Sequence, residues 1–296
     1  MTAPHTVSPP SVAHAPAPTR AGRARLAARR AHTARASLAC CHLCAHHCGV
    51  DRLAGIAGEC RAGATARVFS AQTEVSDELA LGPTFAIALS GCDLRCAFCI
   101  TGRESWDAQA GEPLDVAALA ARATAALSAG ARSVMILGGE PTVFLPDALA
   151  LAAQLPESAT LIWKTNAHAS AEARALLDGV FDLWLADYKF GHDACATRLA
   201  RVPDYTAIVR ENLLWAARDH ALIIRHLLMP GHVECCWHPI AAWIGTHLPG
   251  TRVSLREGFW PAWQSSRHAE LRGTATAAEI ARARAIATEF SLNLIA

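Results

Sequence analysis

The chain has 296 residues, enough for one large domain or for one domain with a small appendage. Its net charge of +1 at pH 7 argues against nucleic acid as a partner, and no apolar run is long enough to span a membrane. Eleven cysteines without a recognisable secretory signal indicate a reducing compartment, so we expect a cytoplasmic protein whose clustered thiols bind metal.

The first part of the chain differs in composition from the rest. Residues 1–38 are rich in Ala, Pro, Arg and His and contain no acidic residue, which predicts a disordered or partly helical tail. A cysteine-rich, metal-binding segment is expected at residues 39–75. We assign residues 76–296 to the main domain, because a regular alternation of strand and helix patterns begins there.

That alternation predicts an α/β fold. The expected strands are residues 84–90, 133–139, 159–165, 182–189, 221–227 and 251–257. The expected helices are residues 114–130, 146–155, 169–179, 205–219, 238–248 and 276–290. Strand–helix units with short turns favour a parallel sheet or barrel. Polar residues follow each strand, and in such folds functional groups collect at the carboxyl ends of the strands.

The first of these strand ends carries a cysteine loop, Cys92-x3-Cys96-x2-Cys99. Iron–sulfur cubanes are usually held by four thiolates, so a loop with three leaves one iron open to another ligand. A disulfide would leave an odd thiol, and zinc would need a fourth ligand that the loop does not supply. The spacing therefore favours an iron–sulfur cluster with an open coordination position.

Two motifs together resemble the radical S-adenosylmethionine superfamily. They are the cysteine loop, with aromatic Phe98 before its last cysteine, and Gly138-Gly139-Glu140-Pro141 after the second strand. The resemblance implies a partial (β/α)6 TIM-like radical SAM barrel with a small N-terminal Cys-rich segment. It also implies a 4Fe–4S cluster that reductively cleaves S-adenosylmethionine to a 5′-deoxyadenosyl radical, while the protein orients the reactants and excludes water.

More specifically, the chain resembles pyruvate formate-lyase activating enzyme and its uncharacterised relatives with an N-terminal cysteine cluster. The similar stretches include LSGCDLRCAFC, WKTNAHAS, LADYKFG and IIRHLLMPGH. This resemblance implies an oxidoreductase that activates a glycyl radical enzyme and takes electrons from a donor such as flavodoxin or ferredoxin. The alternatives are radical modification of another protein, peptide or small molecule, and a non-catalytic iron–sulfur electron carrier. A zinc-binding regulatory module is a weaker alternative.

The resemblance also assigns roles by position. Gly138, Gly139 and Glu140 match the motif that meets the methionine amino group, where a strand-end glycine pair admits a ligand and a carboxylate suits an ammonium. The remaining expected cofactor contacts are Phe98, Thr165, Asp187, Lys189 and Arg225. For Lys189 and Arg225 the alternative is an ordinary salt bridge at the rim of the barrel.

Lys164 departs from the family pattern. Of the 27 basic residues only Lys164 and Lys189 are lysines, so each is a candidate for chemistry that a guanidinium cannot perform. Some activating enzymes have an aspartate at the position of Lys164, which helps to hold a monovalent cation near the cofactor. Our hypothesis is that the Lys164 ammonium takes the place of this cation and pairs with Asp187. Ile100 and Thr101 also depart from the Gln-Asn that many relatives carry after the third cysteine. This departure affects the expected contacts with the substrate and not the cluster.

The N-terminal cysteines form a second candidate site. Cys41, Cys44, Cys48 and Cys60 could hold a second 4Fe–4S cluster or zinc, and neighbouring histidines leave the zinc alternative open. Cys40 could replace Cys41. Cys195, Cys235 and Cys236 are interpreted as buried or incidental thiols, and no catalytic role is assigned to His226 or His232.

Overall fold

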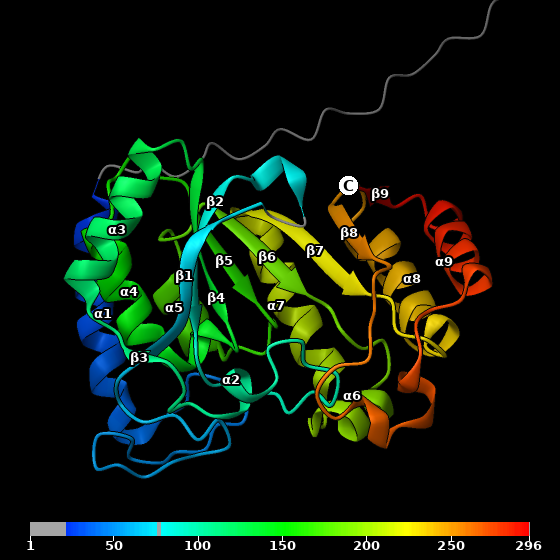
Figure 1. The fold of residues 1–296 in the computed structure, drawn as a ribbon, viewed down its shortest axis with the longest axis horizontal. Coiled ribbons are helices and arrows are strands. Elements are labelled where there is room, and N and C mark those ends of the chain that lie inside the picture. The colour runs from blue at the N-terminus through cyan, green and yellow to red at the C-terminus, as the bar shows by residue number, and fades with distance from the viewer. Residues whose placement is uncertain (1–21, 76–77, 296) are drawn as a thin grey trace, which may run out of the picture.

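The computed structural model describes residues 22–75 and 78–295. Its centre is one sheet of nine strands in the order β3-β1-β2-β4-β5-β6-β7-β8-β9 (Figure 1). From β2 to β9 neighbouring strands are parallel, whereas β1 runs antiparallel to both β2 and β3. The expected α/β class with a mostly parallel sheet is therefore confirmed, and the open sheet is compatible with a partial barrel.

All six expected strands are present, and additional strands extend the sheet at both edges. The expected strands are β2 (Thr84–Leu89), β4 (Ser133–Gly138), β5 (Leu161–Thr165), β6 (Leu183–Asp187), β7 (Ala221–Leu227) and β8 (Arg252–Arg256). The additional strands are β1 (Arg67–Glu74), β3 (Glu112–Pro113) and β9 (Asn293–Leu294). Every residue of β2 is buried, as expected for a strand covered on both faces by the crossover connections of a parallel sheet.

The six expected helices also form. They are α3 (Val116–Ser128), α4 (Leu145–Gln154), α5 (Ala171–Leu177), α7 (Tyr205–Asp219), α8 (His238–His247) and α9 (Ala277–Glu289). Side-chain caps fix several starts: the Asp115 side chain accepts a hydrogen bond from the Ala118 amide, and Ser170 accepts one from Ala173. Two short helices, α2 (Arg103–Trp106) and α6 (Asp193–Ala200), lie in the connections after β2 and β6.

The segment expected to be a disordered or partly helical tail contains helix α1 (Arg23–Ser37), which packs along α4. Residues 1–21 of that stretch lie outside the described part. Strand β1 falls within the expected cysteine-rich segment, so the chain joins the main sheet before residue 76. None of the described helices combines the length and the apolar character needed to cross a membrane.

Candidate functional site

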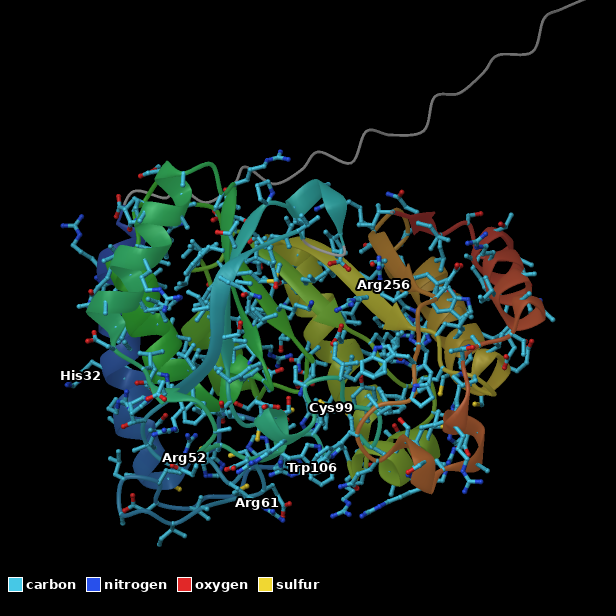
Figure 2. The ribbon with its side chains drawn as sticks, viewed as in Figure 1. His32, Arg52, Arg61, Cys99, Trp106 and Arg256 are labelled. Atoms are coloured by element: carbon cyan, nitrogen blue, oxygen red, sulfur yellow. The ribbon has the colours of Figure 1, made fainter. Side chains whose placement is uncertain are left out.

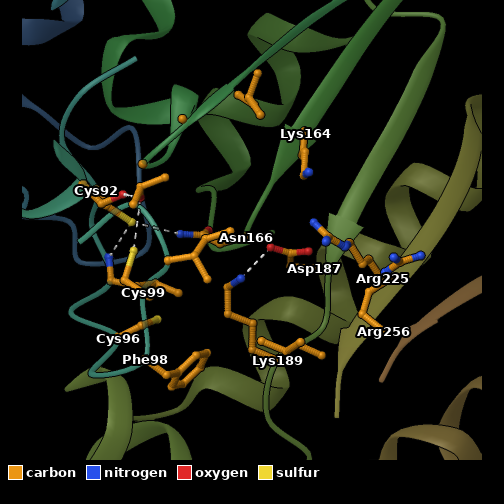
Figure 3. Close-up of a pocket in the computed structure, with 18 of the residues that line it drawn as sticks. Cys92, Cys96, Phe98, Cys99, Lys164, Asn166, Asp187, Lys189, Arg225 and Arg256 are labelled. Carbon is orange, nitrogen blue, oxygen red and sulfur yellow. Dashed lines mark hydrogen bonds and ion pairs between the residues drawn. The ribbon is translucent and has the colours of Figure 1, made fainter. Parts of the chain in front are cut away.

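The carboxyl ends of the parallel strands surround a cavity of about 380 Å³. The cysteine loop after β2, the glycines at the end of β4 and polar residues from β5 to β8 all border this cavity (Figure 3). At the scale of the whole molecule, Cys99 lies at the same end as Trp106 of α2 and Arg61 of the N-terminal segment (Figure 2). The volume falls in the range of small-molecule and cofactor sites.

The cysteine loop is held against the end of β4 by backbone hydrogen bonds. The Gly139 amide donates to the Leu89 carbonyl at 2.8 Å, and the Glu140 amide donates to the Gly91 carbonyl at 2.9 Å. A Cβ at Gly139 would come within 2.0 Å of the Gly91 oxygen, so only glycine permits this approach. The glycine pair therefore sets the position of the loop that carries Cys92.

All three loop cysteines border the cavity, and Cys92 and Cys96 are buried. Burial raises the pKa of the Cys92 thiol, and the Asp93 carboxylate raises it further. Burial also raises the pKa of Cys96, to about 12, against the opposing influence of Lys189. A bound metal centre would oppose both increases in pKa, because its positive charge stabilises the thiolate form that binds metal.

Glu140 does not border the cavity. Its Oε1 accepts hydrogen bonds from the Thr142 amide at 3.0 Å and from the Thr165 hydroxyl at 2.9 Å. Its Oε2 accepts one from the Asn166 amide at 2.7 Å. Burial and the nearby Asp93 raise the pKa of Glu140 to about 7. The side chain thus ties the end of β4 to the end of β5, and the expected pairing with an ammonium would require it to turn away from these donors.

A cluster of charges occupies the opposite side of the cavity, around Asp187 at the end of β6 (Figure 3). Lys189 forms an ion pair with Asp187. Burial acts to raise the pKa of Asp187, but Lys189, Arg225 and Lys164 together hold it below its ordinary value. For Lys189, burial acts to lower the pKa, and the Asp187 carboxylate more than compensates. Three cations, from β5, from β7 and from the loop after β6, therefore act on one carboxylate.

Arg225 is held in place by a buried carboxylate, that of Glu78. Its Nε lies 3.5 Å from Oε1 of Glu78, which is fully buried. The Ser254 hydroxyl donates to the same oxygen at 2.7 Å. The salt-bridge alternative for Lys189 and Arg225 is thus observed in part, yet both side chains also border the cavity. An ion pair that orients a cation toward a pocket can position it for an anionic ligand.

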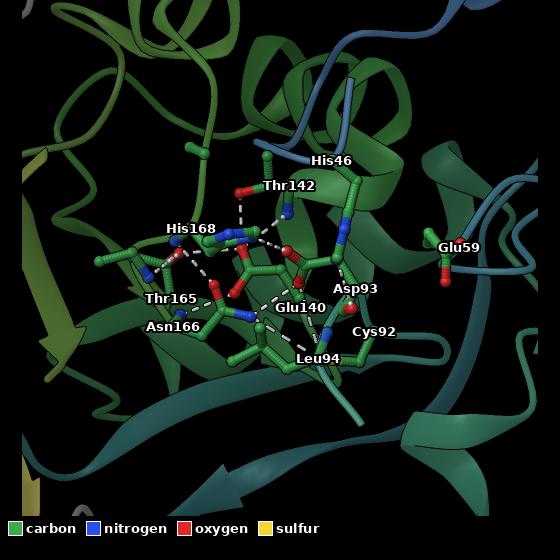
Figure 4. Close-up of polar contacts among 12 residues, drawn as sticks. His46, Glu59, Cys92, Asp93, Leu94, Glu140, Thr142, Thr165, Asn166 and His168 are labelled. Atoms are coloured by element: carbon green, nitrogen blue, oxygen red, sulfur yellow. Dashed lines mark hydrogen bonds and ion pairs between the residues drawn. The ribbon is translucent and has the colours of Figure 1, made fainter. Parts of the chain in front are cut away.

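Behind the cysteine loop lies a buried polar network centred on Asp93 (Figure 4). Asp93 Oδ2 lies 2.7 Å from His168 Nδ1, and its Oδ1 accepts a hydrogen bond from Asn166 Nδ2, also at 2.7 Å. Asn166 Nδ2 also lies 3.8 Å from Cys92 Sγ. Burial acts to raise the pKa of Asp93, but the hydrogen bonds from His168 and Asn166 hold this pKa below its ordinary value.

The N-terminal cysteine segment docks on this network. The Ala45 amide donates to the His168 carbonyl at 3.0 Å, and His46 Nε2 lies 3.0 Å from the Asp93 carbonyl oxygen. Cys44 forms an isolated antiparallel bridge with Ala169. The expected second site therefore lies beside the loop after β5 and close to the three-cysteine loop.

Electrostatic interactions connect the four N-terminal cysteines in pairs. Burial raises the pKa of Cys44, as do the charges of Cys60 and Cys48, and burial together with Cys41 acts in the same direction on Cys60. Cys40 is exposed, whereas Cys41, Cys44 and Cys60 are buried. Among the described residues, these cysteines do not form a set whose sulfur atoms all lie within 4.8 Å of one another.

Apart from Glu140, every residue expected to contact the cofactor borders the cavity; these are Phe98, Gly138, Gly139, Lys164, Thr165, Asp187, Lys189 and Arg225. Phe259 and Trp260, which the sequence motifs do not identify as site residues, line the cavity after β8. The run of aromatic residues beyond the last strand is the available signal for them. Asp93 and His168 are likewise not identified by any motif, although Asp93 directly follows the first cysteine of the loop.

The donor set fits an iron–sulfur cluster with a bound organic cation and carboxylate. Three soft thiol ligands come from one loop, which leaves room for a ligand that is not a protein side chain. Backbone glycines border one side of the cavity, and Lys189 and Arg225 supply positive charge on the other. Phe98 and Phe259, with ring centroids 6.3 Å apart, add an apolar wall.

Comparisons with known proteins agree with this geometry. Residues 87–244 match the family model described as the Radical SAM superfamily. The uncharacterized protein MJ0674 of Methanocaldococcus jannaschii is 29% identical over 269 residues, which cover 86% of this chain and 76% of that protein. Structures of SuiB from Streptococcus suis, bound to the precursor peptide SuiA or to S-adenosylmethionine, have a similar fold, with a TM-score of 0.52 at 17% identity. The similarity covers 69% of this chain but only 46–47% of the SuiB chain, so it extends over about half of SuiB.

Proposed function

The chain belongs to the radical SAM superfamily, and we propose that it reductively cleaves S-adenosylmethionine at a 4Fe–4S cluster held by Cys92, Cys96 and Cys99. The observation that carries this proposal is the position of all three thiols at one wall of the cavity whose other walls are the strand-end glycines and the Lys189–Asp187 pair. When bound, the cluster supplies the electron that splits the sulfonium and yields a 5′-deoxyadenosyl radical.

The residues of the chain bind and orient the reactants. We assign Gly138 and Gly139 to the methionine moiety, because their side of the cavity lies next to the cysteine loop. Lys189 and Arg225 are assigned to the carboxylate or the ribose, since both cations are held in place by acidic partners. Glu140 acts as a positioning residue, because its carboxylate joins the ends of β4 and β5.

The experiment is metal analysis and 5′-deoxyadenosine release under dithionite, on anaerobically reconstituted protein. We expect release from the native chain, none when dithionite is omitted, and none from Cys96→Ala, which should also lose about four irons per chain. A fully loaded native protein that releases no 5′-deoxyadenosine, with or without candidate substrates, would instead favour the non-catalytic electron carrier.

For the substrate we propose a polypeptide, with the backbone glycine of a glycyl radical enzyme as the first candidate. Two exposed apolar side chains border the mouth of the cavity, Ile100 at 63% and Trp260 at 55% exposure. Such a mouth suits an apolar or aromatic segment better than a small polar metabolite. The second candidate is a precursor peptide, favoured by the fold shared with SuiB, which has been crystallised with one.

These two substrate classes leave different traces. A glycyl radical target should acquire a stable doublet signal in electron paramagnetic resonance after anaerobic incubation with the protein, S-adenosylmethionine and a reductant such as flavodoxin or ferredoxin. A peptide target should instead change mass without retaining a radical. The absence of both traces, together with rapid turnover of a small molecule, would contradict the polypeptide proposal.

For the N-terminal segment we propose a second 4Fe–4S cluster held by Cys41, Cys44, Cys48 and Cys60. Its support is the spacing of these four cysteines and the docking of their segment beside the Asp93–His168 network, close to the three-cysteine loop. The double variant Cys44→Ser/Cys60→Ser should lower iron from about eight to about four per chain. A loss of zinc rather than iron in that variant would assign zinc to this segment.

A further inference from the structure

Four side chains outside the cavity converge on one point. They are Cys195, His232, Cys235 and Cys236, whose ligand atoms all lie within 4.8 Å of one another. Cys195 belongs to α6, whereas the other three lie in the connection between β7 and α8. From this convergence we propose a second type of metal centre in the chain, a structural zinc site with three thiolate ligands and one imidazole ligand.

The distances between these atoms match the edges of a tetrahedron around zinc. Cys235 Sγ lies 3.8 Å from Cys195 Sγ and 3.9 Å from Cys236 Sγ. His232 Nδ1 lies 3.3 Å from Cys235 Sγ and 3.5 Å from Cys236 Sγ. Zinc bonds of about 2.3 Å to sulfur and about 2.0 Å to nitrogen place tetrahedral ligand atoms about 3.5–3.8 Å apart. A disulfide would require sulfur atoms about 2.0 Å apart, far closer than any observed pair.

The local backbone brings the ligands together. His232, Cys235 and Cys236 have the spacing that places side chains on one face of a helical turn. The turn here is a single π-helical turn, Val233–Trp237, and such turns are frequent at functional sites. The β6–α6 loop touches this turn directly, because a Cβ at Gly191 would come within 2.2 Å of the Cys236 carbonyl oxygen.

A carboxylate and a guanidinium lie on the far side of the imidazole. His232 Nε2 lies 3.8 Å from Glu270 Oε1 and 3.5 Å from an Nη of Arg198 of α6, and Glu270 and Arg198 form an ion pair with each other. Binding of the metal through Nδ1 would leave the proton on Nε2, the side of the ring on which Glu270 lies. Arg198 also partly balances the net negative charge of three thiolates and one zinc ion. Glu270 comes from the connection after β8, so a third loop supports the site.

The centre would fasten the loops that complete the cavity. The loop after β6 carries Lys189, and the connection after β7 follows directly on Arg225 and its strand. A closed four-ligand site contributes stability and has no open position for chemistry. The zinc would therefore fix the relative positions of two cofactor-binding strand ends without taking part in the reaction.

The test is zinc content and zinc-edge X-ray absorption of the full chain, purified anaerobically with iron and zinc supplied. We expect about one zinc per chain, with three sulfur neighbours at about 2.3 Å and one nitrogen neighbour. Cys195→Ser/Cys235→Ser should lose the zinc and keep its iron, whereas Cys96→Ala should lose iron and keep the zinc. His232→Ala should lose the zinc, and His232→Cys should retain it because a thiolate can replace the imidazole.

The absorption spectrum of the native chain decides the question even where a variant does not fold. A native protein without zinc, or with a Cys195–Cys235 disulfide after anaerobic purification, would overturn the proposal. So would zinc that persists in Cys195→Ser/Cys235→Ser and disappears in Cys44→Ser/Cys60→Ser. Because the readout is zinc rather than turnover, failure of the proposed radical activity would leave the result intact.

Discussion

His168 Nδ1 lies 2.7 Å from Asp93 Oδ2, and both side chains are buried. Asp93 directly follows the first cysteine of the loop, and the His168 carbonyl accepts a hydrogen bond from the N-terminal cysteine segment. This one contact therefore connects the three-cysteine loop, the end of β5 and the second cysteine group. A buried carboxylate is stable only with hydrogen-bonded partners, so the contact is energetically important.

Removing the imidazole should destabilise this junction. His168→Ala would leave the buried Asp93 carboxylate with Asn166 as its remaining side-chain donor, and we expect the free energy of unfolding to fall by about 3–5 kcal/mol. His168→Asn is the matched control, because its amide can still donate to Asp93. Anaerobic thermal unfolding measures the effect, and equal melting temperatures for the two variants would refute this role.

Lys164 should replace a monovalent cation near the cofactor. Its charge helps to lower the pKa of Asp187 from the neighbouring strand. We expect 5′-deoxyadenosine release by Lys164→Ala to become dependent on added potassium, whereas the native chain needs none. Release by Lys164→Ala that is unchanged without any cation would rule out the replacement.

Lys189 should contribute to binding of S-adenosylmethionine. Lys189→Met would remove a cation that borders the cavity and leave its partner Asp187 facing only Arg225 and Lys164. A lost charge-assisted hydrogen bond of about 2 kcal/mol corresponds to roughly a 30-fold rise in Kd. Equilibrium binding to the reconstituted protein measures it, with Lys189→Arg as the charge-preserving control. An unchanged Kd in Lys189→Met would remove this residue from the binding site.

His226 should make the protein less stable in mild acid. Burial lowers its pKa to about 4, with Asp187 opposing this shift and His232 and Lys189 adding to it. Its Nδ1 lies 2.8 Å from the Tyr188 carbonyl oxygen, and its ring stacks on Trp237 at 5.1 Å. Between its ordinary pKa of 6.5 and about 4, the unfolded chain binds a proton that the native protein excludes, so stability falls as the pH falls.

The size of this effect is about 2 kcal/mol between about pH 7 and pH 5. We expect His226→Phe, which can keep the ring stack, to be less stable than the native chain at neutral pH and to lose less stability on acidification. Unfolding curves of both proteins across this range provide the measurement. Parallel pH dependences for the two proteins would show that His226 does not cause the loss.

Much of this architecture could be predicted from the sequence, because hydrophobic periodicity and strand-end polar residues are local signals. The six strands and the cavity position of residues such as Lys189 follow from them. The Cys195–Cys235 contact could not be predicted, since 40 positions separate the two residues and only the docking of α6 on the π-helical turn joins them. The Glu140 carboxylate is held out of the cavity by hydrogen-bond donors at the end of β5, and the Gly-Gly-Glu motif does not reveal these donors.

Helix α1 falls in a segment for which composition left two alternatives open, a disordered or a partly helical tail. Its sequence is rich in Arg and Ala, and the helix is stabilised by packing along α4 rather than by a marked apolar face of its own. Arg23 shows this dependence, because its guanidinium donates to the Ala159 carbonyl at 2.8 Å, and 136 positions of the sequence separate the two residues. Composition alone could not distinguish such a helix from a disordered tail.

The measurement that tests the central claim most directly is electron–nuclear double resonance on the dithionite-reduced protein with S-adenosylmethionine labelled with ¹⁵N at the methionine amine. If Cys92, Cys96 and Cys99 hold a cluster with one open iron, the labelled nitrogen should show a hyperfine coupling to it. The coupling should be lost in Cys96→Ala and retained in Cys195→Ser/Cys235→Ser. A fully loaded, reduced cluster without any nitrogen coupling would contradict the account, because the three-cysteine loop would then not present its open iron to the cofactor.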